Sequence, residues 1–322
     1  MSARVPVTVL TGHLGAGKTT LLNRILKEDH GRRYAVIVNE FGAIGIDGDL
    51  IVHDEEELFE LGNGCVCCTV RGDLVRMAHR LLARPQSFDA IVVETSGLAD
   101  PGPVAQTFFL DQFLAERTAL DSVTTVVDAK HILLRLADSA EAEEQIAFAD
   151  QIVLNKTELV TEAELPAIEA RLRAINALAP IHRAVRAGVA LDQVLGRGGF
   201  ELDRIVALEP DFLDPAGHAH DHTSGIRSVS LAHDAPLDGE KVRRWLADLV
   251  AARGADILRG KGILAIAGAP RRLVFQSVHM LHECDDQRPW QPGERRESRL
   301  VLIGRDLDEG ALGAAFRACA AA

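Results

Sequence analysis

The fold is decided by the stretch Val5-Pro-Val-Thr-Val-Leu-Thr-Gly-His-Leu-Gly-Ala-Gly-Lys-Thr-Thr20. It begins with a short β-branched run, which predicts a buried strand over Val5–Thr11. Apolar residues at helical spacing follow, which predicts a helix over Lys18–Glu28. Between strand and helix the chain matches G-x-x-x-x-G-K-[ST], the pattern of a phosphate-binding loop, at Gly12, Gly17, Lys18 and Thr19.

Each fixed residue of this loop has a physical task. The glycines let backbone N–H groups close around phosphate oxygens, and the following helix turns its positive N-terminal end to the same anion. Lys18 is predicted to reach the β- and γ-phosphates, and Thr19 to give its hydroxyl to Mg²⁺. The predicted nucleotide contacts in this loop are Gly12, His13, Leu14, Gly15, Ala16, Gly17, Lys18, Thr19 and Thr20.

Further apolar runs at residues 34–38, 90–93, 123–127 and 151–154 alternate with helical stretches, one of them at residues 73–83. Unbroken apolar strands separated by helices indicate a parallel sheet covered on both faces. We therefore expect an α/β fold: a P-loop NTPase domain over residues 1–208, with a mostly parallel sheet flanked by helices.

The pattern changes after residue 208. Residues 209–217 are rich in Pro, Gly and Asp, which favours a linker over 209–224. Strands are expected beyond it at residues 225–231, 262–267, 273–278 and 298–303, and they are polar on one face, which is typical of an antiparallel sheet with helices on one side. Residues 225–322 are predicted to form a smaller α/β (α+β) C-terminal domain.

Composition limits the function classes. The chain has 322 residues and a formal net charge of −12, which argues against a nucleic-acid binder. No apolar run approaches the roughly 20 residues that span a bilayer, and no secretory signal is evident, so we expect no membrane partner and a cytoplasmic protein. Thiols stay reduced in that compartment, so the five cysteines suggest metal or redox chemistry.

A nucleoside triphosphatase also needs acidic groups for its metal and a group that senses the γ-phosphate. Glu94 ends the third apolar run and can reach Mg²⁺, while Gly97 can bring a backbone N–H to the γ-phosphate. Asp47 is a looser candidate for the magnesium shell or for positioning water. Lys18, Glu94 and Asp47 are thus the candidate catalytic residues; the alternative for Glu94 is an ordinary strand-end carboxylate. With no evident fast base or arginine finger, slow intrinsic turnover is expected.

The stretch Asn155-Lys-Thr-Glu158 follows another apolar run. GTPases carry Asn-Lys-x-Asp, whose acid accepts hydrogen bonds from guanine while the Lys packs along the ring. Asn155, Lys156 and Glu158 are therefore predicted to select guanine, although the longer Glu side chain can weaken that selection. The alternative is that Glu158 is a surface acid and the base is recognised elsewhere.

Three thiols lie within four residues, at Cys65, Cys67 and Cys68. Thiolates suit soft ions such as Zn²⁺ and Cu⁺, and a tetrahedral site needs a further ligand. Glu40, a water or a partner's side chain could complete the shell, and an open shell suits a carrier that must release its metal. The alternative is a tight turn of small buried residues.

Together these motifs resemble the CobW-like family of metallochaperone GTPases, a SIMIBI-class family related to the urease and hydrogenase nickel-insertion GTPases. The resemblance rests on Thr11–Thr20, Asn39–Gly42, Gly62–Cys68, Glu94–Gly97 and Asn155–Glu158, and on three segments of the second half, Gly260–Leu264, Phe275–Met280 and Leu300–Gly304. It implies a parallel-sheet GTPase domain, a smaller C-terminal domain and GTP-dependent handling of Zn²⁺ or another transition metal. It also implies that the Cys-x-Cys-Cys loop binds the metal between switch regions.

Two departures and one further cluster bear on this resemblance. His13 replaces the aromatic or apolar residue expected after Gly12, and Ala43 stands where some relatives carry Glu. His218, His220 and His222 alternate, so an extended chain places all three on one side as a candidate low-affinity loading site. Merely solvated histidines are the equal alternative.

We therefore expect a GTP-hydrolysing metallochaperone that uses GTP, Mg²⁺ and Zn²⁺ and delivers metal to a client protein such as a zinc metalloenzyme. A nucleotide-dependent homodimer fits the resemblance. The alternatives are a GTP-binding regulator that senses metal or oxidation, a cobalt or iron insertion factor for cobalamin synthesis or nitrile hydratase, and an ATP-dependent small-molecule kinase, which Asn155-Lys156 disfavours.

Overall fold

The computed structural model describes residues 4–38, 58–60, 68–83, 88–198, 225–278 and 281–321. The chain divides into two compact units, Met1–Ala170 with Ala179–Phe200, and Arg171–Leu178 with Glu201–Ala322. The short segment Arg171–Leu178 joins the second unit, which the sequence did not indicate. The predicted linker at 209–224 lies outside the described residues, so the domain limits that depend on it remain a prediction.

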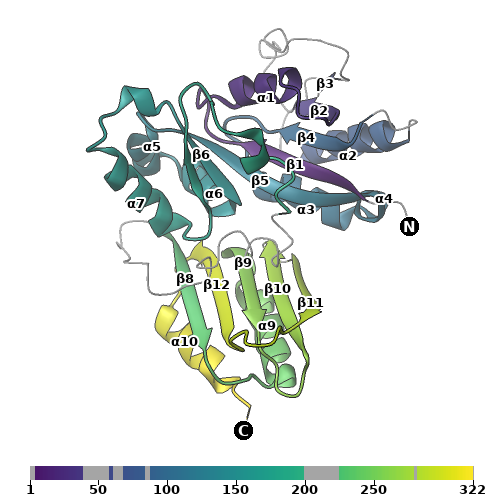
Figure 1. Cartoon of the computed structure of the whole chain (residues 1–322), viewed down its shortest axis with the longest axis vertical. Helices are drawn as coiled ribbons and strands as arrows, with labels where there is room; N and C mark the ends of the chain where they lie inside the picture. The colour runs from purple at the N-terminus through teal and green to yellow at the C-terminus, as the bar shows by residue number, and fades with distance from the viewer. Residues whose placement is uncertain are drawn as a thin grey trace. The chain divides into compact units, whose positions relative to one another are not determined.

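The first unit is built on a seven-stranded parallel sheet in the order β3-β2-β4-β1-β5-β6-β7 (Figure 1). This confirms the predicted P-loop NTPase architecture. The expected strands appear, and two three-residue strands, β3 and β7, join them at the edges. Strands this short do not show a distinct apolar pattern in the sequence, so they were not predicted. The strands are β1 (Val5–Thr11), β2 (Tyr34–Val38), β3 (Leu58–Glu60), β4 (Ala90–Glu94), β5 (Thr118–Asp128), β6 (Gln151–Asn155) and β7 (Ile181–Arg183).

Helices cover both faces of this sheet, with α1 on one side and α3 and α6 on the other (Figure 1). Leu21, Leu22 and Ile25 of α1 pack in one apolar cluster with strand residues such as Val92 and Val126. The helices are α1 (Lys18–Lys27), α2 (Cys68–Leu82), α3 (Pro101–Leu110), α4 (Gln112–Arg117), α5 (Ile132–Asp138), α6 (Ala140–Phe148) and α7 (Leu165–Ile175), whose residues from Arg171 on belong to the second unit, with short 3₁₀ turns η2 (Thr157–Leu159) and η3 (Leu191–Gln193). The helix expected over 73–83 thus begins five residues earlier, at Cys68.

Strand register sets where the functional segments leave the sheet. Glu94 is level with Leu10 of β1 and with Val38 of β2, and Val38 is level with Glu60 of β3. On the other side of β1, the last residues of β5 and β6, Asp128 and Asn155, are paired with each other. Because all these strands are parallel, the segments that follow them emerge at one edge of the sheet, where ligands of open α/β sheets bind.

The second unit is a five-stranded antiparallel sheet in the order β11-β10-β9-β12-β8, with α9 and α10 on one face (Figure 1). Phe275 of the sheet, Leu246 of α9 and Phe316 of α10 share its apolar core. The predicted antiparallel sheet with helices on one side is confirmed. Its elements are β8 (Ile226–His233), α9 (Gly239–Arg253), β9 (Ile257–Leu264), β10 (Arg271–Val278), β11 (Leu281–Pro289), β12 (Ser298–Arg305) and α10 (Glu309–Ala318).

Two strands of this unit differ from expectation. The strand expected at 262–267 runs instead from Ile257 to Leu264 through two glycines. A Cβ on Gly260 would lie 2.5 Å from Ser277 Oγ, so close packing requires a residue with low strand propensity there. The strand β11 was not predicted, because its sequence Leu-His-Glu-Cys-Asp-Asp-Gln-Arg-Pro lacks apolar alternation. Among the residues that the structure describes, no helix has the length and apolar character to cross a membrane.

Candidate functional site

The loop between β1 and α1 is closed by glycines that no other residue can replace without strain. Gly12 and Gly17 have φ angles of 134° and 112°, in the region that side chains rarely adopt. A Cβ on Gly12 would lie 2.1 Å from Val126 O, and one on Gly17 would lie 2.4 Å from Asn155 Nδ2. The loop is therefore pressed against the ends of β5 and β6, and its backbone path is fixed.

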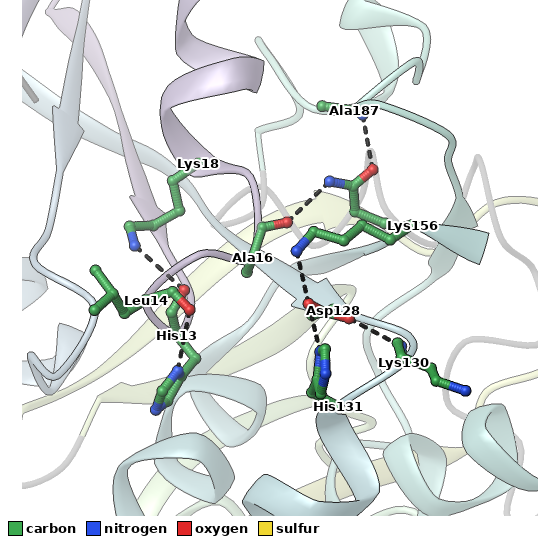
Figure 2. A network of polar contacts seen from close by, with 10 residues as sticks. His13, Leu14, Ala16, Lys18, Asp128, Lys130, His131, Lys156 and Ala187 are labelled. Carbon is green, nitrogen blue, oxygen red and sulfur yellow. Dashed lines mark hydrogen bonds and ion pairs between the residues drawn. The ribbon is translucent and has the colours of Figure 1, made fainter. Parts of the chain in front are cut away.

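Lys18 is buried at the first position of α1, and its Nζ donates a hydrogen bond of 2.9 Å to Gly12 O (Figure 2). The ammonium thus lies inside the curve of the loop. The N-cap of the helix is Gly17, which has no side chain to bond the first-turn N–H groups. Those N–H groups and the ammonium together form a site suited to a phosphate anion.

Thr19 and Glu94, the two residues predicted to serve Mg²⁺, are brought together. Thr19 Oγ1 donates a hydrogen bond of 3.2 Å to Glu94 Oε1, and the Glu94 side chain is buried. A hydroxyl and a carboxylate at this separation suit a hard cation, which prefers oxygen ligands. The donor set therefore fits Mg²⁺ beside the phosphate loop.

The segment after β4 runs along the same loop. Thr95 N donates a hydrogen bond of 2.9 Å to Leu10 O, which extends the pairing with β1 past the strand end. A Cβ on Gly97 would lie 2.5 Å from Leu14 N, so only glycine permits this approach. Gly97 thus lies directly against the phosphate loop, where the sequence predicted a γ-phosphate contact.

Asn155 ties three segments together. Its side chain is 2% exposed, its Nδ2 donates to Ala16 O at 2.9 Å, and its Oδ1 accepts from Ala187 N at 2.7 Å. Thr157 Oγ1 donates to Ala184 O at 3.1 Å, so the segment after β7 is held here as well. Residues 184–187 thus lie against Asn155, a predicted base-site residue. The sequence did not indicate them, because nothing in their composition marks them.

Asp128, also missed, holds the predicted base-site lysine. Lys156 Nζ lies 2.7 Å from Asp128 Oδ2, His131 Nδ1 lies 3.0 Å from the same oxygen, and Lys130 N donates to Oδ1 at 2.9 Å (Figure 2). Burial raises the pKa of Asp128, but hydrogen bonds and charge from Lys156 and His131 outweigh it and hold the pKa below its ordinary value. Asp128 is the last residue of β5, so the strand-end rule that identified Glu94 could have found it.

A cavity of about 280 Å³ opens beside the phosphate loop. Its walls come from the loop itself, from the end of β5 and from α5 and α6. The residues that line it include His13, Leu14, Asp128, His131, Arg135 and Gln145.

Several predicted residues are not placed by the structure. Asp47, Glu40, Cys65, Cys67, His218, His220 and His222 lie outside the described residues. The backbone of Cys68 begins α2. Within the described ranges, no group of three or more His, Cys, Asp or Glu side chains is arranged to hold a metal ion. Glu158 and Thr20 are exposed, in η2 and α1.

Known proteins resemble this chain over its whole length. A zinc chaperone named YjiA from Escherichia coli is 39% identical over 317 residues, which cover 97% of this chain and 98% of that one. A zinc chaperone named CobW from Sinorhizobium is 34% identical and covers 98% of this chain and 97% of its own. The crystal structure of Zn(II)-bound YjiA GTPase from E. coli superposes with a TM-score of 0.75 at 32% identity, over 99% of this chain and 100% of that one.

Two family descriptions divide the chain between them. Residues 6–183 match the CobW/HypB/UreG nucleotide-binding domain, and residues 226–320 match the C-terminal domain of the cobalamin synthesis protein cobW. Both matches agree with the resemblance read from the motifs. The chain therefore belongs to the CobW/HypB/UreG family and carries the CobW type of C-terminal domain.

Proposed function

We propose that this chain is a GTP-hydrolysing metallochaperone that carries Zn²⁺ at its Cys-x-Cys-Cys loop and delivers it to a client protein under nucleotide control. GTP hydrolysis and zinc are the activity and the metal in the names of its relatives, the zinc chaperone YjiA, the YjiA GTPase and a zinc-regulated GTPase metalloprotein activator from Schizosaccharomyces pombe. The names of the relatives do not mention metal binding by the Cys-x-Cys-Cys loop, delivery to a particular client or a nucleotide-dependent dimer, so these are parts of the proposal. The cytoplasmic location remains a prediction.

The observation that carries the proposal is the strand register at the edge of the sheet. The chain leaves β3 at Glu60, enters the Cys loop, and returns at Cys68 as α2. Glu60 is level with Val38, and Val38 is level with Glu94. Adjacent strands are about 4.8 Å apart, so the Cys loop starts about 10 Å from the end of the strand that carries Glu94. Glu40, two residues beyond Val38, follows the strand between them.

Nucleotide chemistry at this edge follows from the described residues. Mg²⁺, when bound by Thr19 and Glu94, supplies positive charge to the phosphates. Lys18 and the N–H groups of the loop hold the β- and γ-phosphates, and Gly97 N–H meets the γ-phosphate. Asn155 and Lys156 hold the guanine side of the site, and Glu158 selects the base.

Coupling to the metal follows from the same register. GTP draws the segment after β2 toward its γ-phosphate, which the loop after β4 also contacts, and the connection from β3 to α2 that carries Cys65, Cys67 and Cys68 begins beside β2. Loss of the γ-phosphate on hydrolysis releases the segment after β2 and raises the rate at which the metal dissociates. This is an order–disorder switch of the kind that GTPases use.

Two assays on the purified protein test the proposal. Lys18→Ala is expected to abolish GTP hydrolysis, whereas Lys27→Ala, an exposed lysine on the same helix, retains it. Cys67→Ser is expected to weaken Zn²⁺ binding in the presence of a GTP analogue, whereas Cys284→Ser, on β11, does not. Undiminished hydrolysis in Lys18→Ala, or undiminished Zn²⁺ affinity in Cys67→Ser, contradicts the proposal. A Cys67→Ser protein that no longer binds zinc but still activates its client favours the alternative of a GTP-binding regulator that delivers no metal.

A further inference from the structure

A buried amide on α6 holds the loop that follows β4. Gln145 is 1% exposed, and its Nε2 donates hydrogen bonds of 3.1 Å to both Gly97 O and Ala99 O. Loss of the amide would leave two carbonyl groups without these donors in a largely buried setting, which costs more than an ordinary hydrogen bond contributes. The side chain therefore fixes the path of the loop at both ends of the turn.

Gln145 is itself anchored to the centre of the sheet. Thr125 Oγ1, on β5, donates a hydrogen bond of 2.7 Å to Gln145 O, and Thr125 is buried. The neighbouring side chains Ala142 and Ile146 of α6 are buried as well. The backbone that carries the amide is therefore tied to the sheet.

The loop that it holds has little tolerance for displacement. A Cβ on Gly97 would lie 2.5 Å from Leu14 N and 2.7 Å from Leu14 Cα, so the two backbones are already in close contact. The direction of the Gly97 N–H relative to the phosphate loop depends on this approach. An outward shift of about 1 Å is enough to remove a hydrogen bond to a phosphate oxygen.

We propose that Gln145 is a positioning residue for the discrimination of GTP from GDP. It holds Gly97 against the phosphate loop so that its N–H is already aimed at the γ-phosphate before the nucleotide arrives. GDP has no γ-phosphate and gains nothing from this arrangement. The inference rests on the proposed function, in which Gly97 is the group that contacts the γ-phosphate.

The test compares two buried glutamines of the same unit. Gln145→Leu removes the two hydrogen bonds to the loop. Gln151→Leu is the matched control, because Gln151 is also 1% exposed and its Nε2 donates to Thr124 Oγ1 at 2.6 Å and to Val194 O at 3.0 Å, away from the loop. Dissociation constants are measured for GDP and for a non-hydrolysable GTP analogue, both with Mg²⁺.

For Gln145→Leu we expect the GTP analogue to bind about tenfold more weakly while GDP affinity changes less than about twofold. In Gln151→Leu the dissociation constants of both nucleotides should change by the same factor. An unchanged ratio of the GTP-analogue and GDP affinities in Gln145→Leu, whether both weaken equally or neither changes, overturns the inference. If Gln145→Leu does not fold, Gln145→Met keeps a similar length and removes the donors without burying a charge, and the same ratio decides.

Gly97→Ala separates this inference from the proposed function. If Gly97→Ala leaves the ratio of the two affinities unchanged, the role of Gly97 in the proposed function is wrong. If Gly97→Ala lowers the ratio and Gln145→Leu does not, the proposed function stands and only the role of Gln145 is wrong.

Discussion

Lys156 and Asp128 form an ion pair of 2.7 Å at the ends of two neighbouring strands, β6 and β5. Only 29% of the lysine side chain and 14% of the aspartate side chain are exposed, so solvent screens the pair less than a surface pair. The pair lines the cavity beside the phosphate loop. The lysine predicted to pack along the base is thus held in place by a residue outside the predicted guanine motif.

Asp128→Asn should weaken both GDP and GTP binding by about tenfold, because Lys156 loses the charge that positions it along the base. Both nucleotides carry the same base, so the ratio of their affinities should not change. Fluorescent-nucleotide titration measures this effect. Asp138→Asn is the control, since Asp138 forms an exposed ion pair with Arg135 on α5 and should leave binding unaltered. Unchanged affinity in Asp128→Asn would show that Lys156 needs no partner.

Asn155→Ala should destabilise the first unit by about 2–3 kcal/mol even without nucleotide, because Ala16 O and Ala187 N both lose a buried partner. Urea unfolding of the nucleotide-free protein measures the change in free energy of unfolding. Gln112→Ala removes an exposed hydrogen bond to Glu116 and should cost less than about 0.5 kcal/mol. Equal effects in the two variants would contradict the bridging role of Asn155.

Glu158→Ala should reduce the preference for GTP over ATP by about tenfold, because the carboxylate is the group expected to accept hydrogen bonds from guanine. Glu158 is exposed, so its replacement should not disturb the fold. Competition of GTP and ATP for the bound fluorescent nucleotide gives the preference. Glu162→Ala, a nearby exposed acid, should retain it. A preference that survives in Glu158→Ala means that the base is recognised elsewhere.

Stability of the second unit should depend on pH through Glu294. Hydrogen bonding and charge from Arg288, with a smaller contribution from Arg272, lower the pKa of Glu294 to about 2 from an ordinary 4.5. A carboxyl group whose pKa is lower in the folded than in the unfolded protein stabilises the folded state. For Glu294 this stabilisation is fully present above pH 4.5, the ordinary pKa of the group. That contribution should disappear as pH falls from 4.5 toward about 2.

Thermal unfolding across this pH range checks the prediction. Glu294→Gln should lower the midpoint at pH 7 and make it less sensitive to acid than in the unaltered protein. Asp234→Asn is the control, because the ion pair of Asp234 with Arg295 is 75% and 70% exposed and contributes little. Parallel acid profiles for the unaltered and Glu294→Gln proteins would contradict the assignment.

Much of the fold could be read from the sequence because the parallel strands are continuous apolar runs. Val5–Thr11, Tyr34–Val38 and Gln151–Asn155 have the length and composition of buried strands, and the structure confirms them. The second unit was harder at β11, an edge strand whose sequence carries charged residues in place of apolar alternation, and at β9, where packing against Ser277 and Leu300 requires glycine.

The residues of the candidate site also differ in whether the sequence could predict them. Lys18, Thr19 and Asn155 belong to local motifs, so the sequence alone predicts them as site residues. Asp128 and Gln145 make their contacts with segments distant in the chain, and their sequence surroundings are ordinary. Gln145 lies 48 residues from Gly97, and only the folded helix brings its amide to that loop.

The central claim is that the nucleotide controls the metal, and Zn²⁺ affinity in the two nucleotide states tests it most directly. Zn²⁺ is titrated into the protein with Mg²⁺ and either a non-hydrolysable GTP analogue or GDP, using a competing chromophoric chelator. We expect at least about tenfold tighter binding with the GTP analogue, and loss of that difference in Cys67→Ser. Equal Zn²⁺ affinities in the two states would contradict the account, because a ligand that binds both states equally shifts neither.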